Sequence, residues 1–222
     1  MSSPKIFPVV NYLDRLTALA EVAQAIECDA DGCFLISHMG DDTELLEVAA
    51  AIQKIHPGFP VGVNLLSRSA AEAAKQVNSW ALPMMWADYP GVASTGIQDL
   101  AREVTRASYD LFDVPGFEVF ASVACKHQPI DLDPALAAKN ALAAGFIPTT
   151  SGEGLAPSLE KVIAMSAATG GVLALASGVT PGNIAAYAPY LSHVLVATGV
   201  AGTKYHLDAA KLRLLISNSR EK

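Results

Sequence analysis

Short runs of apolar residues alternate along this chain with longer segments whose apolar residues recur at helical spacing. Each run ends at polar residues or glycine and is followed by a helical pattern, which is typical of parallel strands joined by crossover helices. Eight such units predict a (β/α)8 TIM barrel, an α/β fold that spans residues 1–222 as a single domain. The predicted strands are Ile6–Val10, Cys33–Ser37, Pro60–Leu65, Pro83–Ala87, Glu118–Cys125, Phe146–Thr149, Leu173–Ala176 and His193–Ala197.

Local signals predict where the helices begin. Ser, Thr, Asp and Asn side chains accept hydrogen bonds from the first turn of a helix, and a Glu three residues later completes a capping box. Proline is tolerated at the first helical position because its missing N–H has no partner there. The predicted starts are Asp14, Asp41 with Glu44, Ser69 with Glu72, Ile97, Asp133-Pro134, Pro157, Thr180-Pro181 and Asp208.

The segment from Leu173 to Gly199 carries the main functional pattern. Its two apolar strands end at Ser177-Gly178 and at Thr198-Gly199. Each turn precedes a helical segment, so backbone N–H groups and the positive ends of helix dipoles are expected to face one small space. In TIM barrels the loops after the last two strands often form a phosphate site. We therefore expect these four turn residues to bind a small phosphorylated substrate. The alternative is that both turns only end their strands.

Composition limits the possible partners. The chain is 51% hydrophobic and 17% charged, which provides for a large core. We find no apolar window of about 18 residues and no signal-peptide pattern, so no membrane partner is expected. A net charge of −7 without a basic cluster argues against nucleic acid. Three cysteines without metal-type spacing suit free thiols in a cytoplasmic protein, and the low charge favours a homo-oligomer that covers apolar surface.

Polar side chains that directly follow the predicted strands would meet at the mouth of a closed barrel. Lys126 follows the apolar run FEVFASVAC, where burial would disfavour its charge. It can form a Schiff base, act as an acid or pair with an anionic substrate; alternatively it extends from the rim into solvent. His38 or Asp88 can move protons opposite Lys126, and Asn64 can hold the substrate by hydrogen bonds.

The loop after the sixth strand is expected to cover the site. Thr150 and Gly152 in this loop are candidate substrate contacts. Glu153 is a candidate acid or base, a contact to a sugar hydroxyl, or a solvated surface charge.

The other histidines are expected to lie outside the chemistry. Period-2 alternation from Lys126 predicts that His127 points away from the barrel centre. His56, His193 and His206 are expected to be structural. No HxH or paired-carboxylate spacing indicates a metal, so no metal or other cofactor is expected. A metal-dependent hydrolase or transferase that uses Asp88, His38 and Glu153 is a third-ranked alternative.

Several of these stretches together resemble the BtpA family of TIM-barrel proteins. The similar stretches are VGVNLL (Val61–Leu66), FASVACKH (Phe120–His127), TTSGEG (Thr149–Gly154) and SGVTPGN (Ser177–Asn183), which cover the barrel from the third strand onward. SGVTPGN is also shared with phosphate-binding barrels such as phosphoribosylanthranilate isomerase. The resemblance implies a TIM barrel with a phosphate pocket.

The first third of the chain departs from the BtpA pattern. Such chains have a longer loop after the first strand and a Glu-Asn pair after the second. Here the first strand runs to Asn11-Tyr12 and the second ends at Ser37-His38, so the expected carboxylate is missing. The family is associated with photosystem I assembly, and a related branch with nucleosides or sugars.

Two functional hypotheses follow. The first is an enzyme, an isomerase or an aldolase-like lyase, that acts on a sugar or ribosyl phosphate with Lys126 and either His38 or Asp88. The second is a barrel without catalysis that works as an assembly or regulatory factor. The missing acidic pair after the second strand motivates the second hypothesis.

Overall fold

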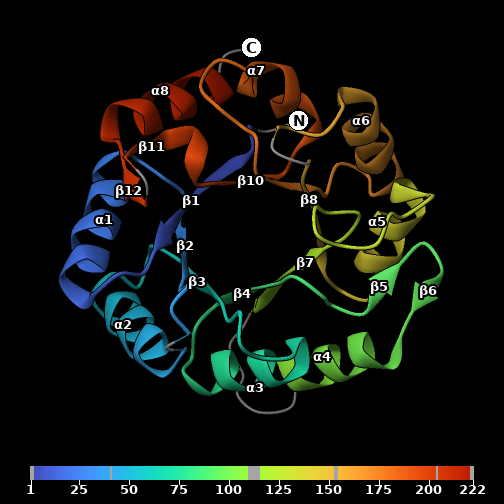
Figure 1. Ribbon diagram of the computed structural model, residues 1–222, viewed down its shortest axis with the longest axis horizontal. Helices are drawn as coiled ribbons and strands as arrows, with labels where there is room; N and C mark the ends of the chain where they lie inside the picture. The colour runs from blue at the N-terminus through green and yellow to red at the C-terminus, as the bar shows by residue number, and fades with distance from the viewer. Residues whose placement is uncertain (1–2, 41, 110–115, 153–154, 204, 221–222) are drawn as a thin grey trace.

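Eight parallel strands close into a barrel in the order β1-β10-β9-β8-β7-β4-β3-β2, with β2 paired to β1 (Figure 1). The computed structural model describes residues 3–40, 42–109, 116–152, 155–203 and 205–220. The closed parallel barrel confirms the predicted (β/α)8 fold. Its strands are β1 (Lys5–Asn11), β2 (Cys33–Ile36), β3 (Val61–Asn64), β4 (Met84–Ala87), β7 (Glu118–Ser122), β8 (Ile147–Thr150), β9 (Ala174–Ala176) and β10 (His193–Val196).

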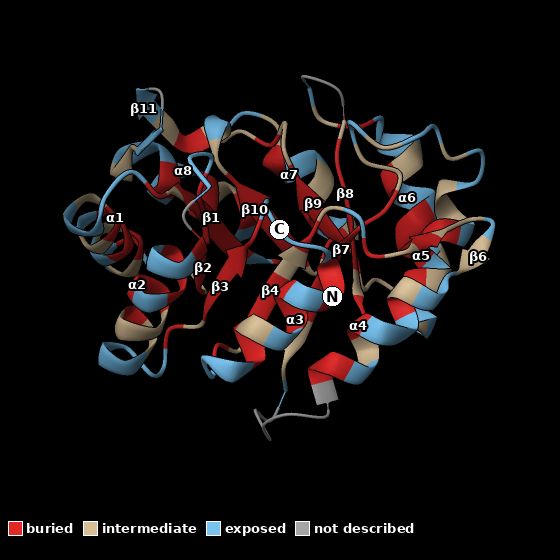
Figure 2. Ribbon diagram, turned by 60° about the horizontal axis from the view of Figure 1, so that its bottom comes forward, coloured by how far each residue is buried: buried red, intermediate tan, exposed pale blue. Residues whose placement is uncertain are grey.

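Helices form an outer ring around the strands, with buried inner faces and exposed outer faces (Figure 1, Figure 2). In the described ranges, no helix has the length and apolar character needed to cross a membrane. The helices are α1 (Arg15–Glu27), α2 (Asp42–Ile55), α3 (Ala70–Ser79), α4 (Asp99–Tyr109), α5 (Pro134–Ala143), α6 (Leu159–Ala168), α7 (Ile184–Tyr187) and α8 (Ala209–Arg220), with short 3-10 turns η1 (Ala188–Tyr190) and η2 (Thr198–Val200).

Four predicted helix starts are confirmed by the capping bonds. One is Asp208, whose Oδ1 accepts the N–H of Lys211 at 3.0 Å at the start of α8. Asp14 Oδ1 accepts the N–H of Thr17 at 2.9 Å and begins α1. Ser69 and Glu72 form the reciprocal capping box of α3. Asp133 caps α5, with proline as its first residue. These starts were predictable because each cap bonds within its own first turn.

Other predicted helix starts differ from the structure. The expected cap at Thr180 was wrong: α7 begins only at Ile184, and Asn183 Oδ1 accepts the N–H of Thr180 at 2.8 Å. This bond holds residues 180–183 in a turn instead of a helix. Ser158, one residue after the expected Pro157, caps α6 by accepting the N–H of Lys161. The capping box predicted at Asp41 lies outside the described residues.

Two small antiparallel hairpins extend the loops after β4 and β10. They are β5 (Val92–Ala93) with β6 (Gly96–Ile97), and β11 (Ala201–Thr203) with β12 (His206–Leu207). The sequence pattern predicted neither hairpin. The first one displaces the start of the fourth helix from the expected Ile97 to Asp99, because Ile97 pairs with Val92.

The barrel interior is filled by an aromatic cluster. Phe7, Phe34 and Phe120 meet edge to face, with ring centroids 5.1–6.0 Å apart. Gly62 on β3 makes room for this cluster, since a Cβ there would overlap the Phe34 ring. Gly62 is therefore needed for packing of the aromatic cluster. Side chains fill the barrel interior below the mouth.

His193 on β10 lies in the same interior. Its ring contacts Phe7 and Phe120 at centroid distances of 5.6 and 5.1 Å. Nδ1 lies 2.8 Å from Ser192 Oγ, and Nε2 is buried without a hydrogen-bond partner among the described residues. Burial lowers the pKa of His193 from 6.5 to about 4, with a further contribution from the charge of Lys5. The imidazole is therefore neutral in the folded protein.

This burial predicts that the folded state loses stability in mild acid. Because the unfolded chain binds the proton near pH 6.5 and the folded chain only near pH 4, the free energy of unfolding decreases as pH falls through this window. The loss attributable to His193 is roughly 3 kcal/mol. We expect His193→Leu to remove this part of the dependence in urea titrations at several pH values. His56→Leu is the control, because His56 is exposed, and it should keep the full pH dependence of the free energy of unfolding. If His193→Leu also keeps it, burial of His193 is not its cause.

Candidate functional site

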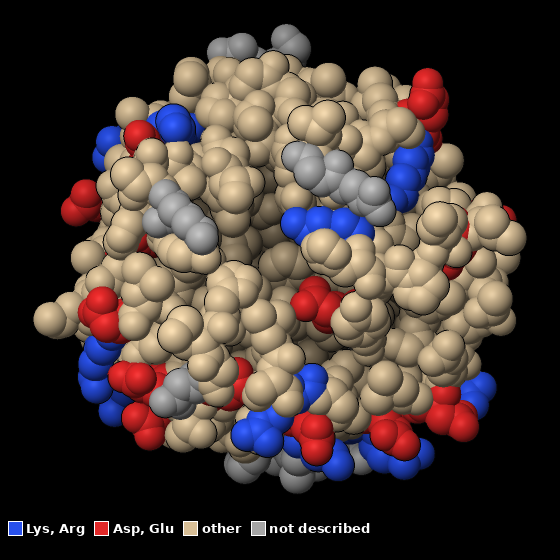
Figure 3. All heavy atoms as spheres, in the orientation of Figure 1, with Lys and Arg blue, Asp and Glu red and all other residues tan. Residues whose placement is uncertain are grey.

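The carboxyl ends of the barrel strands surround a cavity of about 710 Å³. In the circular strand order, β9 and β10 lie four positions from β3 and β4 respectively, so the two pairs face each other across the mouth. The space-filling view shows a hollow at the centre of this face, with a basic and an acidic side chain beside it (Figure 3). The cavity therefore has two opposed walls, which we call the β9–β10 wall and the β3–β4 wall.

Two glycines allow close backbone packing at the β9–β10 wall. Gly199 packs so closely that a Cβ would overlap the carbonyl oxygen of Val179. Gly178 has a φ of +78°, and a Cβ there would overlap the backbone of Ala156. Neither position accepts a larger residue without backbone movement, because backbone atoms cannot rotate away. The two predicted turns thus lie in direct contact.

Four backbone N–H groups on this wall are without a hydrogen-bond partner among the described residues. They belong to Gly178, Val179, Thr198 and Gly199. All four residues line the cavity. Unpaired N–H groups at a cavity wall are uncommon, and several together form a site for an anion.

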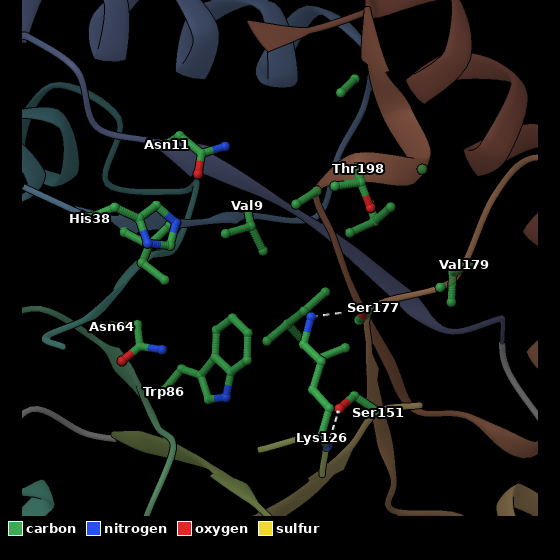
Figure 4. A pocket seen from close by; sticks show the side chains of 18 of the residues that line it. Val9, Asn11, His38, Asn64, Trp86, Lys126, Ser151, Ser177, Val179 and Thr198 are labelled. Atoms are coloured by element: carbon green, nitrogen blue, oxygen red, sulfur yellow. Dashed lines mark hydrogen bonds between the residues drawn. The ribbon is translucent and has the colours of Figure 1, made fainter. Parts of the chain in front are cut away.

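Lys126 reaches this wall from the end of β7. Its Nζ donates to Ser177 Oγ at 3.4 Å, and its backbone N–H donates to Ser151 Oγ at 3.1 Å (Figure 4). The residue is exposed, so the burial expected from the sequence is not observed. Its ammonium group lies beside the Ser177-Gly178 turn, which suits an ion pair with an anion.

Asp88 and Asn64 meet on the β3–β4 wall. Asn64 is 3% exposed and its Nδ2 donates to Asp88 Oδ2 at 3.4 Å. Burial raises the pKa of Asp88, while hydrogen bonds from Asn64 and Ser122 and the charge of Lys126 act in the opposite direction. A carboxyl group with a raised pKa is suited to proton transfer near neutral pH.

A hydrogen-bonded network that sequence reasoning missed supports this wall. Trp86 Nε1 donates to Ser122 Oγ at 2.9 Å. Gln128 Nε2 donates to the carbonyl oxygens of Asp88 and Ser122 at 2.6 and 2.9 Å, and its Oε1 accepts from the Cys125 N–H. Alternation was the available signal for Trp86. It lies two residues before Asp88, which directly follows β4, and residues two apart in extended chain point to the same side.

The loop after β8 is only partly at the cavity. Thr150 is fully buried, and its hydroxyl donates to the Ala124 carbonyl at 3.3 Å, so it holds the loop after β7 and is not among the cavity-lining residues. A Cβ at Gly152 would overlap the backbone near Leu155 and Pro157, which gives this glycine a packing role. Glu153 lies outside the described residues.

The structure places three histidines at the cavity wall. His38 lies across the cavity from Lys126, with Trp86 between them (Figure 4). His127 also lines the cavity, contrary to the expectation that it points away. The alternation argument failed because β7 ends at Ser122 instead of the predicted Cys125, so the chain is irregular there. His206, expected to be structural, pairs through Nδ1 with Glu21 Oε1 at 2.9 Å, also at the wall.

The described residues contain no group of three or more His, Cys, Asp or Glu side chains arranged to hold a metal ion. Of the residues proposed as metal ligands, the structure describes His38 and Asp88.

Comparisons with known proteins define the class of this chain by its fold. No protein-family model and no curated protein matches it. Among solved structures it is similar to KGPDC from Streptococcus mutans in complex with a phosphorylated sugar, with a TM-score of 0.73, 11% identity and 97% of each chain covered. It is also similar to phosphoribosyl anthranilate isomerase from Thermus thermophilus, with a TM-score of 0.66 and 17% identity over 96% of this chain and 97% of that one.

A third similar structure is 3-keto-L-gulonate-6-phosphate decarboxylase from Vibrio cholerae, with a TM-score of 0.67, 12% identity, and 97% of this chain and 98% of that chain covered. At such low identity these likenesses establish the fold. The chain is a TIM-barrel protein.

The contact between the two turns predicts a strong effect of one added methyl group. Gly199→Ala forces the new methyl group against the Val179 carbonyl, so we expect a loss of about 1–3 kcal/mol in the free energy of unfolding. Gly182→Ala is the matched control in the neighbouring turn, because only Thr180 Oγ1 lies near its Cβ position, at 3.8 Å. Thermal unfolding of both variants measures the difference. Equal stability of the two variants would contradict the close approach of Gly199 to the Val179 carbonyl.

The half-buried Asp88 carboxylate predicts a gain in stability when its charge is removed. Since the folded-state pKa of Asp88 is raised, protonation favours folding, and this contribution is lost as pH rises through that pKa. We expect Asp88→Asn to melt at a higher temperature than the wild type at pH 7. The difference should shrink in acid, where the wild-type carboxyl is also neutral. A lower melting temperature for Asp88→Asn than for the wild type at pH 7 would contradict a raised pKa of Asp88.

Proposed function

We propose that this chain is an enzyme similar to the BtpA family. It acts on a small phosphorylated metabolite, such as a sugar phosphate or a ribosyl phosphate. One observation carries the proposal: four N–H groups without an acceptor among the described residues lie with the Lys126 ammonium at one wall of the cavity, opposite the Asp88 carboxyl group. The solved structures with similar folds include one in complex with a phosphorylated sugar and one named for a 6-phosphate substrate. These names support the same substrate class.

The β9–β10 wall is suited to a phosphate monoester. Such a group carries a charge of about −2 near pH 7 and has three strong acceptor oxygens. The N–H groups of Gly178 and Gly199 would donate to these oxygens, and Lys126 would supply the opposing charge. Lys126 Nζ already lies 3.4 Å from Ser177 Oγ, so its ammonium group is beside the turn that would hold the phosphate.

The β3–β4 wall is suited to proton transfer at the other end of the substrate. An aldose–ketose isomerisation removes a proton from the carbon beside a carbonyl and returns one to its neighbour. Asp88 is the proposed base and acid, and Asn64 orients its carboxyl group through the 3.4 Å hydrogen bond. His38 lines the same cavity and is the second candidate for moving protons.

The position of Lys126 bears on the reaction type. With Nζ beside Ser177 at the phosphate end, the ammonium group pairs with the anion and lies away from the proposed reacting carbons. This favours an isomerase over a lyase that forms a Schiff base on this lysine.

Removal of the Lys126 charge tests the phosphate site. We expect Lys126→Met to weaken the binding of ribose 5-phosphate about tenfold or more, because a charge-assisted hydrogen bond is lost. Isothermal titration calorimetry at low ionic strength measures the dissociation constant, and added salt should weaken the wild type more than the variant.

Lys139→Met is the matched control, since Lys139 is exposed on α5 and is not among the cavity-lining residues. Its affinity should equal that of the wild type. If no phosphorylated sugar binds, or if both variants bind equally well, the phosphate site is contradicted. The non-catalytic assembly or regulatory role would then be the better hypothesis.

A further inference from the structure

The cavity is larger than a simple sugar phosphate requires. Even if each of its non-hydrogen atoms took the about 30 Å³ that a water molecule takes in the liquid, a pentose phosphate would occupy no more than roughly 400 Å³. The cavity measures about 710 Å³, which lies within the range of sites that hold drug-sized molecules. A phosphate bound at the β9–β10 wall and its sugar therefore leave part of the cavity unfilled.

The remaining space faces the indole of Trp86. This residue lies on β4, which is opposite β10 in the closed barrel. The half-buried ring projects into the cavity between Asn64 and Lys126 (Figure 4). A phosphate at the β9–β10 wall would thus place the far end of its molecule near the indole.

The indole is held in a fixed orientation. Its Nε1 donates to Ser122 Oγ at 2.9 Å, and its ring meets Phe34 edge to face with centroids 6.3 Å apart. A fixed aromatic surface loses little conformational freedom when a ligand stacks on it. Ser122 is itself 2% exposed, so the support of the indole is rigid.

Apolar side chains extend this surface, and polar groups border it. Val9, Ile36 and Leu66 line the same cavity, and a fully hydroxylated sugar would not match them. The Asn64 amide and the Asp88 carboxyl group lie on the same wall and offer donors and acceptors to the edge of a planar ring. The wall therefore combines an aromatic face with hydrogen-bonding groups.

We propose that the substrate carries, at the end away from its phosphate, a planar aromatic or heterocyclic group that stacks on Trp86. This inference rests on the proposed function, since it takes the phosphate at the β9–β10 wall as its fixed point. It assigns Trp86 to substrate selection and narrows the substrate class to sugar phosphates with a planar substituent.

The test compares two probes that differ only in the planar group. AMP is ribose 5-phosphate with a heterocycle in place of one hydroxyl. The chain has two tryptophans, so the Trp80→Phe variant leaves Trp86 as the single indole reporter. We expect AMP to quench this fluorescence saturably and to bind about 5- to 150-fold more tightly than ribose 5-phosphate.

Trp86 variants identify the source of this preference. Trp86→Leu should bind AMP no more tightly than ribose 5-phosphate, while its affinity for ribose 5-phosphate stays within about twofold of the wild type. Trp86→Phe keeps an aromatic face and should retain part of the preference. Unchanged ribose 5-phosphate binding also shows that the variants are folded.

The outcomes separate this inference from the proposed function. If ribose 5-phosphate binds through Lys126 but AMP binds no more tightly, the planar group is excluded and the phosphate site stands. If Trp86→Leu weakens the binding of AMP and of ribose 5-phosphate equally, stacking on Trp86 is likewise excluded and the phosphate site stands. If neither probe binds the wild type, both the phosphate site and the stacking site are overturned.

Discussion

Closure of the barrel by β1 is the constraint on which the site depends. The first half of this strand pairs with β10, from Lys5 opposite His193 to Pro8 opposite Val196. Its second half pairs with β2, from Val9 to Asn11. This stagger is expected of strands that are tilted about a barrel axis. Because the ring is closed, the ends of β9 and β10 must face those of β3 and β4, and the two walls of the cavity are fixed relative to each other.

The two walls differ in chemistry in a way that suits a molecule with two different ends. The β9–β10 wall offers backbone N–H groups and the Lys126 ammonium. The β3–β4 wall offers the indole of Trp86 and the Asn64–Asp88 pair. Under the proposed function, a substrate that spans the mouth would be oriented by its phosphate before any proton is moved. Orientation of this kind supplies a large part of enzymatic rate enhancement.

The mouth of the barrel also holds unfavourable features that the rest of the fold must offset. Ser177 has a φ of +90°, and Ala124 and His127 have φ values of +49° and +68°, all in the left-handed region that disfavours side chains. Asp88 is held where burial opposes its charge. Burial of apolar side chains around Phe34 and beneath the outer helices stabilises the fold and offsets the cost of these features.

Sequence by itself determined the eight barrel strands and the presence of a helical segment after each of them. The alternation of apolar runs and helical patterns indicated the eight units, and caps such as Ser69 with Glu72 marked helix starts, because these signals act within a few residues. The Ser177-Gly178 turn was also recognisable, since glycine at a strand end is a local signal. Only the tertiary structure decided that Trp86 lies across the cavity from the Ser177-Gly178 and Thr198-Gly199 turns and that Lys126 reaches Ser177. Those relations join residues that are distant in the chain, and barrel closure, which no local pattern encodes, brings them together.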